Sequence, residues 1–153
     1  MGKIRLFLSL NLKSTEIELL KKDQAAVKEK LGVEDIRWSD PEKFHLTLRF
    51  LGDIDEDKAP ALAETLERLK FDFETIDFET ENIGFFPESK YPNVIYAGLK
   101  ENGNNSEVLV GFIDKIIYNF GVKPDKRFIP HITLGRFNSN NRRKITEPLD
   151  FSI

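Results

Sequence analysis

The 153-residue sequence contains no cysteine, so it can form no disulfide bond and lacks the thiolate ligands on which most structural zinc sites depend. It has only two histidines, His45 and His131, and they do not stand at the short spacing of a metal-ligand pair. We therefore predict no metal ion and no other cofactor. The lack of cysteine is also consistent with a reducing compartment.

Long apolar runs are absent as well. No stretch approaches the roughly twenty residues that a membrane helix requires, and the start Met1–Leu6 lacks the hydroxyl residue of a myristoylation signal. We expect a cytoplasmic protein with no membrane partner. The length and the 40% hydrophobic content are typical of a single domain over residues 1–153 with a substantial core, and we expect a monomer.

The net charge of -3 argues against a protein that follows long nucleic-acid backbones, because such affinity comes from neutralising many phosphates. Binding of a short nucleic-acid end stays open. Residues 123–144 are locally basic, with Asp125 as their single acid, although a solvated charged face would explain part of this pattern.

Each histidine opens a copy of one tetrapeptide, His45-Leu46-Thr47-Leu48 and His131-Ile132-Thr133-Leu134. An imidazole can donate or accept a proton near neutrality, so a matched pair suits acid-base catalysis. In a strand, residues i and i+2 share a face, so each histidine would lie beside a threonine hydroxyl. Two such strands side by side would suit a phosphodiester, whose non-bridging oxygens need donors and whose attacking and leaving oxygens need proton transfer.

A structural role for either histidine alone is the usual alternative, but the repeated setting favours catalysis. Alternation predicts that Phe44, Leu46, Leu48 and Phe50 face the core, opposite His45, Thr47 and Arg49. It also predicts a half-buried strand over residues 4–12, on whose polar face Phe7 stands. Such a ring either packs under a loop or offers a flat surface to a ligand.

The two halves of the chain look alike, because strands and a helix lead into a motif strand twice. Helices are predicted from Ser14 to Gly32, over about 56–69, and from a capping Ser106 to Gly121. The fold class predicted is α+β, with two pseudo-symmetric lobes, each an antiparallel β-sheet with helices on its outer face. The motifs would meet in an active-site groove between the lobes. Residues 149–153 would begin one more strand.

The chain resembles the 2H phosphoesterases, named for two H-x-T/S-x motifs, and within them the RNA 2',3'-cyclic phosphodiesterases, also called 2'-5' RNA ligases. The resemblance covers the chain to about Phe137, and rests on Arg5–Phe7, Arg37-Trp38, Phe44–Leu48, Phe50–Gly52, Phe86-Pro87, Pro130–Leu134 and Arg136. Members of this family usually continue with a final strand and a short tail, whereas this sequence ends at Ile153.

The resemblance implies a role for each motif residue. His45 would be the proton donor and His131 the proton acceptor, while the hydroxyls of Thr47 and Thr133 hold the phosphate. A base would lie between Phe7 and Arg136. Strict alternation places Arg136 on the face opposite to His131, so its role requires a bulge or a bent strand end.

The implied activity is hydrolysis of RNA 2',3'-cyclic phosphate ends, or of small nucleotides that carry this group, to 2'-phosphomonoesters. The reverse reaction with a 5'-hydroxyl would be an ATP-independent 2'-5' RNA ligation. Two alternatives stay open: a phosphoesterase acting on another small cyclic nucleotide, and a non-catalytic nucleotide-binding module of the same fold. Intact histidines and threonines in both motifs favour an enzyme, because binding alone does not require a proton donor together with an acceptor.

Overall fold

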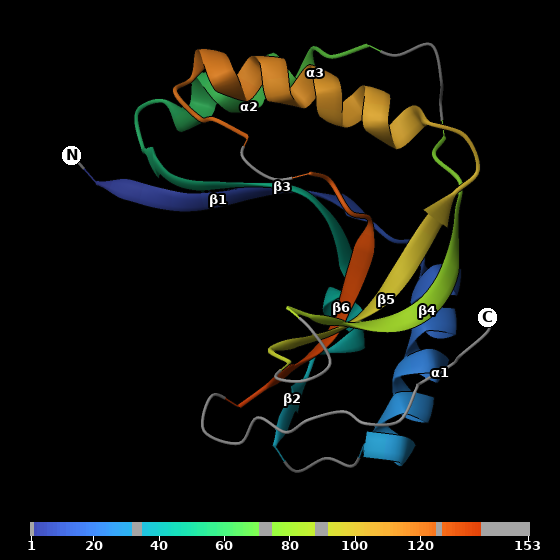
Figure 1. The fold of residues 1–153 in the computed structure, drawn as a ribbon. Helices are drawn as coiled ribbons and strands as arrows, with labels where there is room; N and C mark the ends of the chain where they lie inside the picture. The colour runs from blue at the N-terminus through green and yellow to red at the C-terminus, as the bar shows by residue number, and fades with distance from the viewer. Residues whose placement is uncertain (1, 32–34, 71–74, 88–91, 125–126, 139–153) are drawn as a thin grey trace. The chain divides into compact units, whose positions relative to one another are not determined.

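The computed structural model describes residues 2–31, 35–70, 75–87, 92–124 and 127–138. These segments contain both strands and helices (Figure 1), and the described strand pairs are antiparallel, which confirms the α+β class. The strands are β1 (Lys3–Asn11), β2 (Ile36–Trp38), β3 (His45–Asp55), β4 (Phe78–Phe86), β5 (Val94–Glu101) and β6 (His131–Phe137). The helices are α1 (Ser14–Leu31), α2 (Ala59–Glu67) and α3 (Asn105–Asn119), with a 3-10 turn, η1, at Pro41–Lys43.

The predicted repeat is present in the order of these elements. The first motif strand, β3, follows β1, α1 and β2, and the second motif strand, β6, follows β4, β5 and α3. The prediction of two separate sheets is wrong for the described strands. They form one sheet of order β1-β3-β6-β5-β4, with β2 also paired to β6, because β3 has hydrogen-bonded neighbours on both of its edges. The predicted start of a strand at residues 149–153 lies outside the described residues.

The contacts divide the chain into two compact units. One contains residues 1–9, 47–78 and 101–129, and the other contains residues 10–46, 79–100 and 130–153. In the first unit, α2 packs against α3. Its core consists of Leu48, Leu51, Ile54, Leu62, Leu109, Val110, Ile113 and Ile117. The guanidinium of Arg49 on β3 forms two hydrogen bonds with the carboxylate of Asp114 on α3, at 2.8 and 3.0 Å, and this ion pair joins strand to helix.

In the second unit, α1 packs on one face of the sheet. Leu20 and Val27 of α1 are buried, as are Leu46, Ile95, Ala97, Ile132 and Leu134 of the strands. The buried side chain of Gln24 donates hydrogen bonds from Nε2 to the backbone oxygens of Ser39 (2.7 Å) and Leu134 (2.9 Å). This amide therefore attaches α1 to β6 at Leu134, the last residue of the second motif.

Replacing Gln24 by leucine is expected to lower the free energy of unfolding by about 1–3 kcal/mol. The partly buried Ser39 oxygen would lose this donor, and the Leu134 oxygen would keep only the backbone N–H of Ser39. The matched control is Lys22→Leu on the exposed side of the same helix, which should change the stability by no more than about 0.5 kcal/mol. Urea unfolding measures both variants. Equal midpoints for the two variants would show that the Gln24 amide does not stabilise β6.

Two details of the sequence prediction are wrong. Ser106 does not cap α3, which begins after Asn104. It lies inside the helix and is buried, with its N–H (2.8 Å) and its hydroxyl both bonded to the carboxylate of Glu101. Phe50 does not face the core but is 70% exposed, while Leu51 is buried. The alternation along β3 thus shifts by one residue after Leu48, because Arg49 is held by Asp114 and Leu51 takes the next core position.

Candidate active site

The pairing of β3 with β6 brings the two motifs together. The strands are antiparallel, with Leu46 directly opposite Ile132, and both of these side chains are almost completely buried. One step along each strand, His45 is therefore opposite Thr133. Because side chains alternate, His45, His131 and Thr133 lie on the face opposite to Leu46 and Ile132, and Thr47 follows His45 on that face of β3. All four are partly buried.

His45 is oriented by the turn before it. Oδ1 of Asp40 accepts a hydrogen bond from the backbone N–H of Glu42 (3.0 Å) and so caps η1. This turn places the backbone oxygen of Lys43 2.9 Å from Nδ1 of His45. Since a carbonyl oxygen only accepts, the proton in this bond belongs to Nδ1. Proton transfer by this ring is then assigned to Nε2, because Nδ1 keeps its hydrogen in the bond to the Lys43 oxygen.

His131 packs against a stacked pair of aromatic rings that the sequence analysis did not assign to the site. Its imidazole meets Phe86 edge-on at 5.1 Å and Tyr96 at 5.4 Å between ring centroids. Phe86 and Tyr96 are themselves stacked at 4.3 Å. Tyr96 is paired with Thr133 across β5 and β6, and its ring lies directly over Gly84, where any side chain would collide with it. Glycine at position 84 thus permits the ring position that restrains His131.

Arg136 returns to the face of His131 because β6 contains a bulge. Ile95 pairs with Gly135, but the next residue, Tyr96, pairs with Thr133, so Leu134 is an extra residue on β6. Leu134 and Gly135 are consequently buried in succession, and Arg136 is exposed. The sequence analysis required a bulge for Arg136 to share the face of His131, and the structure contains one at that place.

Gly135 allows this bulge to pack closely. A Cβ at this position would lie 3.0 Å from Cε3 of Trp38 and 3.2 Å from Cγ2 of Ile36, which is tighter than ordinary van der Waals contact. The backbone of β6 thus approaches the side chains of β2 closely, and the tight packing holds the backbone of Arg136 in register with β2.

Phe7 belongs to the other compact unit and is 49% exposed. Its ring touches the exposed Phe50, with centroids 6.0 Å apart and planes inclined by 42°. Phe7 is therefore not a core residue, and a role of its ring as a surface for a ligand stays a prediction.

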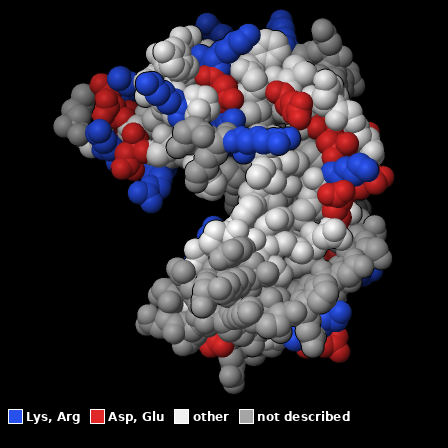
Figure 2. All heavy atoms as spheres, in the orientation of Figure 1, with Lys and Arg blue, Asp and Glu red and all other residues white. Residues whose placement is uncertain are grey.

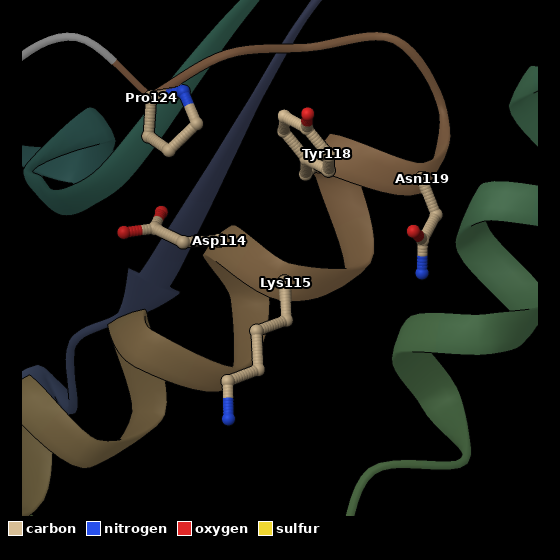
Figure 3. A pocket seen from close by; sticks show the side chains of 5 residues that line it. All are labelled: Asp114, Lys115, Tyr118, Asn119 and Pro124. Carbon is tan, nitrogen blue, oxygen red and sulfur yellow. The ribbon is translucent and has the colours of Figure 1, made fainter.

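The described residues contain no second group of side chains suited to acid-base catalysis. A hollow lined by Asp114, Lys115, Tyr118, Asn119 and Pro124 lies along α3 (Figure 3), but it contains no histidine and the Asp114 carboxylate is paired with Arg49. No cluster of three or more histidine, cysteine, aspartate or glutamate residues suitable for a metal ion occurs in the described part of the chain. None of its helices is long and apolar enough to cross a membrane.

The surface charge gives no single basic track on the face shown in Figure 2. Lysine and arginine side chains there are interspersed with aspartate and glutamate. This mixture agrees with the small net charge of -3.

Comparison with known proteins connects this geometry to a family. The sequence model of the protein family "LigT like Phosphoesterase" matches residues 12–96. The chain is 31% identical over 148 residues to a Methanocaldococcus jannaschii protein named RNA 2',3'-cyclic phosphodiesterase, covering 96% of this chain and 80% of the relative. It is 32% identical over 138 residues to a protein of the same name from Archaeoglobus fulgidus, and this match covers 90% of this chain and 75% of the relative.

Solved structures share the fold. A Thermus thermophilus protein aligns with a TM-score of 0.75 and 25% identity, over 98% of this chain and 82% of its own. Escherichia coli LigT in complex with 3'-AMP aligns with a TM-score of 0.69 and 23% identity, over 98% of this chain and 81% of the LigT chain.

Proposed function

This chain belongs to the LigT-like phosphoesterase family, and we propose that it hydrolyses RNA 2',3'-cyclic phosphate ends to 2'-phosphomonoesters. The observation that carries the proposal is the pairing of Leu46 with Ile132. It sets two histidines and two threonines on one face of adjacent strands, as acid-base attack on a phosphodiester requires. The curated relatives named above supply the substrate class.

The proposed mechanism uses one histidine on each side of the phosphorus. His131, neutral, takes a proton from water as its oxygen bonds to phosphorus, and the bond from phosphorus to O3' breaks. His45, protonated, donates its Nε2 proton to the leaving O3'. The hydrogen bond from Nδ1 of His45 to the Lys43 oxygen supports this role, because it orients the ring with Nε2 as the nitrogen that exchanges the proton.

The substrate is held by the remaining site residues. We propose that the hydroxyls of Thr47 and Thr133 donate to the non-bridging phosphate oxygens, where charge increases in the transition state. A base of the substrate would lie between the Phe7 ring and the Arg136 guanidinium. Small nucleotides with a 2',3'-cyclic phosphate would fit the same site. Reversal with a 5'-hydroxyl in place of water would join RNA ends through a 2'-5' linkage without ATP.

The architecture proposed for this function is a single 2H phosphoesterase domain over residues 1–153. Its arrangement as two pseudo-symmetric lobes with an active-site groove stays a prediction. We propose that the protein acts as a monomer in the cytoplasm.

The test is hydrolysis of a short RNA ending in 2',3'-cyclic phosphate, with the products separated as 2'- and 3'-phosphomonoesters. The 2'-phosphate is expected, and an excess of EDTA should leave the rate unchanged, because two imidazoles and two hydroxyls supply the chemistry without a metal. Formation of the 3'-phosphate alone would contradict the leaving-group assignment. Loss of activity in EDTA with recovery on addition of zinc or manganese would contradict the metal-free mechanism.

A further inference from the structure

Two arginines face each other across β2 and β6. The strands are antiparallel and run side by side (Figure 1), with Arg37 paired directly with Arg136. Paired residues project to the same side of a sheet, so Arg37 shares the face of Arg136. The bulge at Leu134 makes this the face of Thr133 and His131.

Both guanidinium groups are on exposed residues, and neither forms an ion pair with a described aspartate or glutamate. The neighbours of Arg37 on β2 fix the face of the sheet on which it lies. Ile36 is buried, and the Trp38 ring packs against Gly135 on the other face, so alternation directs Arg37 outward. Like charges placed directly opposite each other destabilise a strand pair, and an anion bound between them would remove this cost.

The distance from this arginine pair to Thr133 matches the spacing of neighbouring phosphates in an RNA strand. Arg136 is three residues beyond Thr133 on β6, which corresponds to about 10 Å of extended strand, shortened by the bulge. Arginine side chains are long and bind phosphate oxygens in a bidentate manner. An anion held by Arg37 and Arg136 would thus lie next to the phosphate bound by the threonines, one nucleotide away along an RNA strand. Because a guanidinium is planar, Arg136 would present its face to the base and its N–H edge to this anion.

We propose that Arg37 and Arg136 form a second phosphate subsite, which binds the phosphate on the 5' side of the terminal nucleotide. This inference rests on the proposed function and deepens it, because it names the preferred substrate as a nucleotide that carries a 5'-phosphate group, normally the next phosphodiester of an RNA chain. It also gives Arg37, which has no part in the motifs, a role in specificity.

The experiment compares three substrates: adenosine 2',3'-cyclic phosphate, the same nucleotide with a 5'-phosphate, and the dinucleotide ApA ending in 2',3'-cyclic phosphate. Charge-assisted hydrogen bonds to phosphate predict that kcat/KM for the second and third exceeds that for the first by about tenfold or more. This preference should shrink as salt is raised. In Arg37→Gln and Arg136→Gln the ratio should fall to near one, and Arg37→Lys should restore part of it.

The matched control is Arg68→Gln, which removes the same charge from an arginine on the exposed surface that is paired with Glu64, and it should keep the wild-type ratio. Equal kcat/KM for the three substrates in the wild type would overturn the subsite. A preference for the 5'-phosphorylated substrates that remains in both Arg37→Gln and Arg136→Gln would also overturn the subsite. A preference for the dinucleotide but not for the 5'-phosphorylated nucleotide would assign specificity to the added base, and would also overturn it.

Hydrolysis of none of the three substrates by the wild type would contradict the proposed function instead. In that case the phosphate subsite is tested by the binding of adenosine 5'-monophosphate, which is measured as a rise in the thermal midpoint. A rise in the wild type and Arg68→Gln that is absent from Arg37→Gln would support the subsite, and equal rises in all three proteins would overturn it.

Discussion

Replacing either His45 or His131 by alanine is expected to lower kcat/KM on an RNA 2',3'-cyclic phosphate by about 10²- to 10⁴-fold, the usual contribution of one positioned acid or base. Folding should change little, because both side chains are only partly buried, on the face opposite to Leu46 and Ile132. Steady-state hydrolysis and the thermal midpoint are measured on each variant. The double variant should lose far less than the product of the single losses, because the two histidines act as a unit.

A conservative change separates proton transfer from structure. His45→Asn retains a side-chain N–H that can donate to the Lys43 oxygen but cannot titrate. It should therefore keep the wild-type thermal midpoint and lose nearly as much activity as His45→Ala. Full activity in any single histidine variant would contradict the acid-base assignment. Recovery of activity in His45→Asn would show that the ring is needed only for its hydrogen bond.

Phe7→Ala is expected to lower kcat/KM roughly ten- to a hundredfold, because stacking a base on an aromatic ring is worth about 1–3 kcal/mol. Phe7 is 49% exposed and touches Phe50, which is itself exposed, so the thermal midpoint should fall only slightly. Both quantities are measured on the same preparation, with kcat/KM referred to the folded fraction.

Phe112→Ala serves as the control for Phe7→Ala. Phe112 is an exposed phenylalanine on α3 in the same compact unit, 43% accessible, and its loss should leave kcat/KM unchanged. A large fall in the midpoint of Phe7→Ala, with unchanged specific activity of the folded protein, would mean that the ring packs, and base stacking would be abandoned.

The local features of the fold could be predicted from the sequence. Helical periodicity and the terminal glycines predict α1 and α3 closely, since Gly121 follows α3 with the positive φ of 87° that favours glycine. Alternation correctly separates Leu46 and Ile132 from the histidines. These features depend on the order of neighbouring residues, which a sequence displays directly.

Features that depend on pairing between distant strands could not be predicted. The extra residue at Leu134 is defined only by the register of β6 against β5, so alternation alone could state the need for a bulge at Arg136 but not its place. The Tyr96 ring reaches His131 through the same pairing, and the Phe86 ring reaches it from β4, the strand beyond β5 in the sheet. Phe50 is exposed because Arg49 pairs with Asp114, 65 residues away, and no local pattern indicates this contact.

The pH dependence of kcat/KM on an RNA 2',3'-cyclic phosphate, for the wild type and both alanine variants, tests the central claim most directly. The pH profile of kcat/KM should be bell-shaped for the wild type, because the proton acceptor must be neutral and the proton donor must be protonated. His131→Ala should lose the limb that rises with pH, since no acceptor remains to be deprotonated. His45→Ala should lose the limb that falls at high pH, since no donor remains. A full bell in either variant, or the loss of the opposite limb, would contradict the assignment of His45 as donor and His131 as acceptor.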